Sequence, residues 1–321
     1  MGTCILKSVP SAIHFIRGNR KYWIQPGVLI NSAANTVCNK GNRSGIFDYI
    51  GALTGRFFIP ACLFACAIFV FSHATHATSG VIDASCNTTV YHETVKIKHV
   101  IDGDTVILTD DRHIRLIGIN TPEIGHDGES SQPGAVQAQN YLSKILNHHP
   151  NIRLHYDAQR YDKYGRTLAH LFLDDGTNIQ LLVLRQGMAA PLTIPPNLGF
   201  LACYQAGADF AYEHGHGIWS LPQYQPVQAT QLTPRDLGYR IVTGTISRIG
   251  ESRSAIWINL APHVALRIAR DDLDNFDDLV FSDYAGKEIQ ARGFIEYRNR
   301  EYHMRIRHPV DLNITGVPGG N

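Results

Sequence analysis

Ile101-Asp-Gly-Asp-Thr-Val106 is the stretch from which the fold of this chain can be worked out. Its Asp-Gly pair is a strong turn signal between two strand patterns. Residues 95–100 alternate apolar and polar side chains, as a half-buried strand does, and residues 105–109 can pair back on them. The stretch therefore predicts a hairpin whose tight turn presents two carboxylates, Asp102 and Asp104, at the edge of a sheet.

Further strands and helices follow at short spacing. Strands are expected at 113–119, 152–156 and 167–173, and helices after Pro133, at 178–186 and at 198–213. Five strands joined by short turns can close into a small barrel. Residues 94–220 are therefore expected to form an α+β domain, built on a five-stranded OB-type barrel with three helices.

The composition changes after residue 220. Residues 221–234 are rich in Pro, Gln and Thr without an apolar period, which predicts a linker. Strand patterns resume at 239–246, 255–260, 264–268, 288–294 and 302–306, with an acidic connector at 271–283. They predict a second small β-barrel of OB type over 235–315, followed by a tail, 316–321. Ten arginines between Arg240 and Arg307, interleaved with aromatic residues, give this region either a nucleic-acid-holding surface or an ordinary solvated face.

The first 77 residues differ from the rest of the chain. Residues 1–56 carry seven Lys or Arg and a single acid, residues 57–71 are apolar apart from Pro60, and small residues follow up to Ala77. An apolar run of this length is short for a membrane span, which needs roughly 20 residues. We expect a signal peptide at 57–77 and a secreted or periplasmic protein. The alternative is an inner-membrane anchor at 57–71, with membrane contact only if that segment stays uncleaved. The basic extension 1–56 is expected to be disordered or a mis-called start, and 78–93 leads into the first domain.

Cleavage near Ala77 would leave two of the six cysteines, Cys86 and Cys203. Two cysteines that flank one domain of an exported protein predict a disulfide. The alternative is two free buried thiols. No Cys/His cluster in the sequence has zinc spacing.

Three runs, Ile101–Val106, Arg115–Glu123 and Asp162–Arg166, supply carboxylates and arginines suited to hydrolysing a phosphodiester with a divalent metal. Pro122 fixes the backbone before Glu123, whose carboxylate can then activate water. Arg115 can hold phosphate oxygens bidentately.

The third run is a tight turn with further binding groups. It presents Arg166 as a second cation, and Lys163 and Tyr164 can contact phosphate and base. Simpler alternatives exist for all three runs: a plain hairpin turn, an Arg115–Glu123 salt bridge and a polar turn.

The order and spacing of these runs resemble the thermonuclease (staphylococcal nuclease-like) family from about Thr94 to Ser220, where the chain ends in the family-like Gly217-Ile-Trp-Ser220. The resemblance implies the same barrel fold and a Ca²⁺-dependent nuclease acting on DNA or RNA, with no obligate protein partner. It implies that Glu123 is the general base and that Arg115 and Arg166 clamp the phosphate. It also implies the metal ligands and their support: Asp104, Asn120 and Thr121 as ligands, with Asp102 behind them.

The chain also departs from the family pattern. Asn120 stands where the family has aspartate, which removes one negative charge and predicts weaker metal binding or another divalent cation. The loop 124–133 lacks the family's lysines, and residues 190–197 replace its nucleotide-holding tyrosines. The net charge of +1 provides no global basic field. The alternative function is therefore a catalytically impaired nucleic-acid-binding or scaffold protein of two barrels.

Overall fold

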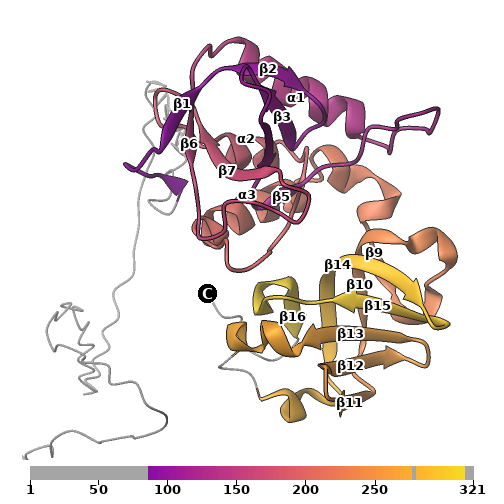
Figure 1. Cartoon of the computed structure of the whole chain (residues 1–321). Helices are drawn as coiled ribbons and strands as arrows, with labels where there is room; N and C mark the ends of the chain where they lie inside the picture. The colour runs from indigo at the N-terminus through magenta and orange to yellow at the C-terminus, as the bar shows by residue number, and fades with distance from the viewer. Residues whose placement is uncertain (1–85, 277–279, 315–321) are drawn as a thin grey trace, which may run out of the picture. The chain divides into compact units, whose positions relative to one another are not determined.

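The computed structural model describes residues 86–276 and 280–314 (Figure 1). The predicted extension 1–56, the signal or anchor segment 57–77, the first half of the lead-in (78–85) and the tail 316–321 lie outside the described residues. Within the described part of the chain, no helix is both long enough and apolar enough to cross a membrane. All of the described residues belong to one compact unit.

The first β-rich region contains a six-stranded sheet in the order β1-β6-β7-β4-β3-β2. Its strands are β1 (Glu93–Val95), β2 (Ile97–Val100), β3 (Thr105–Leu108), β4 (His113–Leu116), β6 (Ile152–His155) and β7 (Thr167–Phe172). The predicted first strand is split in two at Lys96, and within its second part the β2–β3 register shifts between Ile97 and His99. Consecutive strands β1 and β2 thus lie at opposite edges of the sheet, which makes it curl round on itself as the OB-type fold requires.

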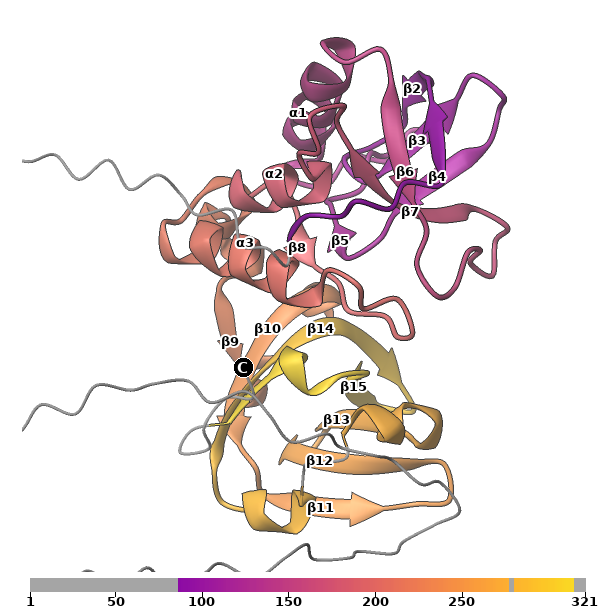
Figure 2. The ribbon, with the colours of Figure 1, turned by 90° about the vertical axis from the view of Figure 1, so that its left-hand side faces the viewer.

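Three helices lie along one side of β6 and β7 (Figure 2). They are α1 (Ala135–Asn147), α2 (Ile179–Arg185) and α3 (Leu201–Glu213), and a short pair, β5 (Ile119–Asn120) with β8 (Ala190–Pro191), lies beside them. Helix α1 buries Ala135, Ala138, Leu142 and Leu146, which share one face at helical spacing. Helix α2 begins after Asn178, whose side chain accepts the N–H of Leu181 at 3.1 Å.

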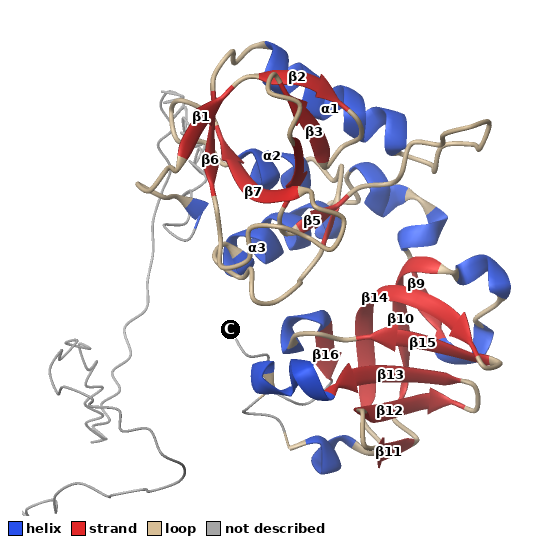
Figure 3. Ribbon diagram, in the orientation of Figure 1, coloured by secondary structure: helices blue, strands red, loops and turns tan. Residues whose placement is uncertain are grey.

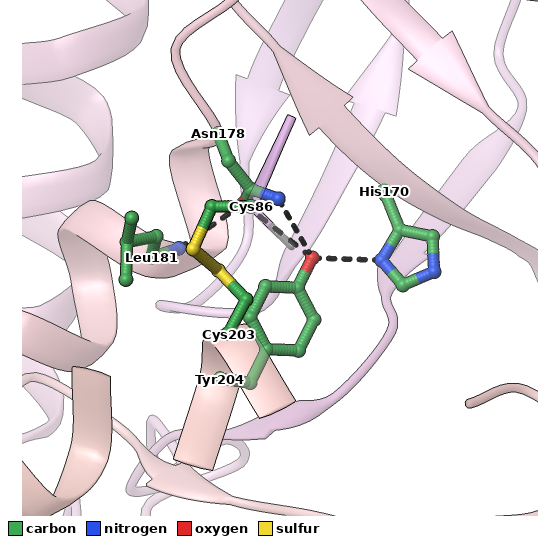
Figure 4. The surroundings of a disulfide bond; sticks show 6 residues. All are labelled: Cys86, His170, Asn178, Leu181, Cys203 and Tyr204. Atoms are coloured by element: carbon green, nitrogen blue, oxygen red, sulfur yellow. Dashed lines mark hydrogen bonds between the residues drawn. A yellow bond between two sulfur atoms is a disulfide. The ribbon is translucent and has the colours of Figure 1, made fainter. Parts of the chain in front are cut away.

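Cys86 and Cys203 form a disulfide in the structure, with their sulfur atoms 2.09 Å apart (Figure 4). It joins the lead-in to α3, as the sequence predicted. Next to it, Tyr204 Oη lies 2.7 Å from His170 Nδ1 and 3.3 Å from Asn178 Nδ2. These contacts fix α3 against β7 and the start of α2.

The second β-rich region is an eight-stranded sheet with short 3-10 turns (Figure 3). The strand order is β11-β12-β13-β15-β14-β10-β9, and β16 pairs with β14. The strands are β9 (Pro226–Gln228), β10 (Gly238–Thr245), β11 (Arg248–Glu251), β12 (Ala255–Ala261), β13 (Val264–Ala269), β14 (Glu288–Arg298), β15 (Glu301–Arg305) and β16 (Leu312–Ile314). The five predicted strands are present, while β9, β11 and β16 were not predicted.

The stretch predicted as a linker is structured. It contains the 3-10 turns η3 (Pro222–Tyr224) and η4 (Ala229–Gln231), and strand β9, which pairs in parallel with β10. Tyr224 is buried with Tyr239 and Ile241 of the second region and with Ile218 and Trp219 of the first. This apolar cluster connects the two β-rich regions. The remaining 3-10 turns are η2 (Gly217–Ser220), η5 (Pro234–Asp236), η6 (Arg270–Asn275), η7 (Phe281–Tyr284) and η8 (Pro309–Asp311).

Candidate active site

The turn between β2 and β3 places Asp104 against Arg115 of β4. Asp104 Oδ2 lies 3.0 Å from Arg115 Nη2 and accepts the backbone N–H of Thr121 at 2.7 Å. The other carboxylate oxygen accepts the hydroxyl of Thr105 at 3.1 Å. The Asp104 side chain is only 2% exposed. The Asp104 carboxylate is therefore buried and held in a fixed position by bonds to Thr105, Arg115 and Thr121.

Gly103 permits this arrangement through close packing. A Cβ atom at this position would lie 2.5 Å from Thr121 Cγ2 and 2.7 Å from the Ala138 side chain. Gln139 of α1 supports the turn from below, because its Nε2 donates to the carbonyls of Val100 and Ile101 at 3.2 and 2.8 Å. Sequence reasoning missed Gln139, which carries no motif and looks like any polar residue of a surface helix.

Arg115 is anchored at several points. Its Nη1 donates to the carbonyls of Leu116 and Ile119 at 2.8 and 2.9 Å, and its Nη2 donates to Asn120 Oδ1 at 3.4 Å. The predicted alternative, an ion pair with Glu123, is not what the structure shows, since Arg115 pairs with Asp104. The guanidinium is therefore positioned before any substrate arrives, which lowers the entropy cost of binding a phosphate.

Glu123 follows Pro122 at the end of β5. Its backbone N–H donates to Gln132 Oε1 at 3.1 Å, and its carbonyl accepts the Gln132 N–H at 2.9 Å, which closes the loop 124–131. Although the side chain keeps much of its exposure, partial burial and then the negative charge of Asp104 raise its pKa, against the opposing effects of Arg115 and Arg166. A carboxylate with a raised pKa that water can reach suits a general base.

Arg166 lies in the turn after β6. Its Nε is 2.7 Å from Asp162 Oδ2, and Asp162 Oδ1 accepts the N–H groups of Tyr164 and Arg166, both at 2.9 Å. Gly165 has φ +80°, a left-handed conformation that closes the turn. Tyr164 is 72% exposed, with Lys163 Nζ 4.8 Å from its ring centroid. The turn thus presents a fixed cation beside a free aromatic face.

A cavity of about 370 Å³ brings Arg115 together with the Asp162–Arg166 turn, whereas Asp104, Asn120 and Glu123 are not part of its lining. It is lined by Arg115, Lys163, Tyr164 and Arg166, and on its far side by Arg307 of the second region. Asp104 pairs with Arg115 at 3.0 Å, and the positive charges of Arg115 and Arg166 both act to lower the pKa of Glu123. Arg307 was not assigned to this site, because nothing in the sequence connects residues so far apart.

The acidic side of the site carries an excess of negative charge. Burial and then the Asp104 carboxylate raise the pKa of Asp102 to about 7, and Glu123 contributes in the same direction. Asp102 Oδ1 also accepts the Asp104 N–H at 3.0 Å, so it supports the turn. Negative charges that gather at one point and raise the pKa of Asp102 favour a cation there.

The oxygen atoms at this point suit a hard divalent cation. Asn120 Oδ1 and Asp104 Oδ2 lie 3.4 and 3.0 Å from the same Arg115 Nη2, and Asn120 Nδ2 donates to the Thr121 carbonyl at 3.4 Å. Among the described residues, no three His, Cys, Asp or Glu side chains group into a metal site. A cation held by Asp104, the Asn120 amide and the Thr121 carbonyl would have one carboxylate and two neutral oxygens, which fits Ca²⁺ with fewer charges than an all-carboxylate site.

Comparisons with known proteins place the first β-rich region in a family. The pattern of the family described as "Staphylococcal nuclease homologue" matches residues 113–221. The chain is 36% identical to the thermonuclease of Staphylococcus intermedius over 137 residues, 41% of this chain and 80% of that protein. It is 31% identical to the thermonuclease of Staphylococcus hyicus over 157 residues, 48% of this chain and 92% of that protein. It is 28% identical to an SPbeta prophage-derived endonuclease of Bacillus subtilis (strain 168) over 135 residues, 40% of this chain and 45% of that protein. The chain belongs to the thermonuclease (staphylococcal nuclease-like) family.

Proposed function

We propose that this protein is an exported, divalent-metal-dependent endonuclease that hydrolyses phosphodiester bonds of DNA and RNA. Family membership and the names of its relatives support the coarser statement, that it is a phosphodiester-hydrolysing nuclease. One observation carries the finer proposal: Arg115 and Arg166 line one cavity, and the positive charge of each acts to lower the pKa of Glu123.

In the proposed reaction, Glu123 accepts a proton from a water molecule as its oxygen attacks phosphorus. Arg115 and Arg166 hold the non-bridging oxygens, on which negative charge increases in the transition state. The opposite P–O bond breaks, and its oxygen takes up a proton from solvent. Asp104, with the Asn120 amide and the Thr121 carbonyl, would hold a Ca²⁺ ion, which when bound neutralises charge on the phosphate.

The test is cleavage of a 12-nucleotide single-stranded DNA, and of its RNA counterpart, by the full-length chain. We expect cleavage with Ca²⁺, none with EDTA, and a rate about 10²- to 10⁴-fold lower for Glu123→Gln. The matched control is Glu129→Gln, since Glu129 is an exposed carboxylate in the adjacent loop. Unchanged oligonucleotide binding without metal-dependent cleavage would instead support the second candidate, a binding protein whose catalysis is impaired.

Export is supported by the Cys86–Cys203 pair, because disulfides persist in oxidising compartments. Mass spectrometry of protein recovered outside the cytoplasm should give an N-terminus near residue 78 and a linked pair of peptides containing Cys86 and Cys203. Protein that stays in the cytoplasm with two alkylatable thiols would contradict this part of the proposal.

A further inference from the structure

A second cavity, with a volume of about 670 Å³ against about 370 Å³ at the candidate active site, is lined by residues 191–194 and by the second β-rich region. Its lining includes five arginines of this region: Arg267, Arg292, Arg298, Arg305 and Arg307. None of the residues assigned to the proposed hydrolysis lines this cavity. The cleavage reaction therefore does not account for its five arginines.

Strand register explains how the arginines come together. Trp257 of β12 is the register partner of Arg267 of β13, and Arg267 is the partner of Arg305 of β15. Leu266 and Met304, their neighbours along the strands, are buried in the core, so the arginines point to the outer face. Like charges directly opposite on adjacent strands destabilise a sheet. The Arg267–Arg305 pair therefore does not contribute to the stability of the fold, which suggests a role in binding.

Carboxylates offset this charge only in part. Asp272 Oδ2 lies 2.8 Å from Arg305 Nη2, and Asp272 Oδ1 lies 3.9 Å from Arg307 Nη1. Burial and then the charge of Arg305 lower the pKa of Arg307, and Arg267 acts in the same direction. Asp209 Oδ1 lies 3.4 Å from Arg292 Nη1. Counting Asp209 and Asp272 with the two lining acids, Glu296 and Asp311, gives four carboxylates against five guanidinium groups. The cavity therefore has an excess of positive charge.

Aromatic rings lie among the arginines. Phe294 of β14 lines the cavity and is 39% exposed, so its ring is accessible from the cavity. The Trp257 ring is also part of the lining, with Arg267 Cζ 5.9 Å from its centroid. Guanidinium groups for phosphates and ring faces for bases are the two elements of sequence-tolerant binding to single strands.

The two cavities are continuous in their lining. Leu192, Ile194 and Arg307 line both of them. We propose that the arginine-lined cavity is an extended binding site for single-stranded nucleic acid, which holds nucleotides flanking the bond cleaved in the adjacent site. The inference rests on the proposed function for what happens in that adjacent site, but binding to the cavity itself does not require cleavage.

The experiment uses the full-length chain and the double variant Arg267→Gln/Arg298→Gln. Neither arginine has an ion pair within the described residues, so the change leaves no buried carboxylate unpaired. The control is Arg248→Gln/Arg253→Gln, which removes two exposed arginines of the same region outside the cavity. Phe294→Ala is a second variant that removes a ring and no charge.

Binding of a fluorescent 12-nucleotide single-stranded DNA is measured by anisotropy in EDTA at several salt concentrations. We expect a Kd about tenfold higher for the double variant, and a log Kd against log salt slope shallower by about 1.4, or roughly 0.7 per lost phosphate contact. Phe294→Ala should raise Kd at least about fivefold, the lower end expected for losing one stacked base. In Ca²⁺, KM for the 12-nucleotide substrate should rise, while cleavage of a dinucleotide should stay unchanged.

Two outcomes separate the inference from the proposed function. Binding by both cavity variants equal to that of the control variant would overturn the inference, whether or not cleavage occurs. Weakened binding by the cavity variants, in a protein that cleaves neither substrate with Ca²⁺, would support the cavity and overturn the proposed hydrolysis. Melting curves of all variants, matched to the unmodified chain, establish that the differences arise in a folded protein.

Discussion

Replacing Asn120 with aspartate should tighten Ca²⁺ binding. Asn120 Oδ1 and Asp104 Oδ2 lie 3.4 and 3.0 Å from the same Arg115 Nη2, so both oxygens belong to one small site. At an effective dielectric constant of about 20, a unit charge roughly 4 Å from a divalent ion gains about 8 kcal/mol. In the metal-free protein, the new carboxylate at position 120 is attracted by Arg115 and repelled by Asp104 over similar distances, so these two effects largely cancel. The loss of hydration of the carboxylate and of the Ca²⁺ ion offsets most of the gain of about 8 kcal/mol.

We therefore expect a net gain of about 1.4 to 2.8 kcal/mol, or ten- to a hundredfold in Kd. Titration calorimetry with CaCl₂, in the absence of nucleic acid, measures this directly. The control is Asn313→Asp, which adds the same charge at an exposed position of the second region. An Asn120→Asp protein that binds Ca²⁺ no more tightly than this control would refute the assignment of Asn120 as a ligand. The Ca²⁺ concentration for half-maximal cleavage should fall by the same factor.

Three further predictions concern other parts of the chain. Arg166→Lys should lower the cleavage rate about 10²- to 10³-fold with an unchanged melting temperature, since lysine lacks the planar fork that Asp162 orients. Replacing both Cys86 and Cys203 with serine should lower the free energy of unfolding in urea by about 3 to 4 kcal/mol, because the bond closes a loop with a sequence separation of 117. Burial raises the pKa of Asp311 to about 7, so the folded chain binds an extra proton and stability falls as the pH rises from about 4 to about 7. Asp311→Asn should therefore stabilise the chain by roughly 1 to 2 kcal/mol at pH 8 and not at pH 4, whereas Asp271→Asn, at an exposed position, should show no such difference between the two pH values.

The strands of the first region could be predicted because their core faces alternate and their turns contain strong signals. The break between β1 and β2 could not, since the residues on either side of Lys96 continue one alternating pattern. Strands β9, β11 and β16 have three or four residues each, too few for a period to show. Their existence depends on the neighbouring strands that they pair with.

The site could be predicted as a set of residues, but its internal bonding could not. From the sequence, the ion pair considered for Arg115 was with Glu123. In the structure Arg115 pairs with Asp104 instead, because the β3–β4 register aligns Arg115 with Thr105, the residue after Asp104. In the same way, Gly103 suggests a turn, while the structure shows that its missing Cβ makes room for Thr121. Both features depend on contacts between segments that the local pattern does not contain.

The second region offers an explanation for what the first region lacks. The loop 124–133 carries no lysine, and residues 190–197 stand where nucleotide-holding tyrosines are expected. Leu192 and Ile194 of that segment instead line both cavities, next to Arg307. If the arginine-lined cavity binds the strand, the substrate contacts missing from the loops of the nuclease region are supplied by a separate β-sheet. The cleavage site then needs to hold little more than the phosphate, and substrate length, rather than base identity, should set the affinity.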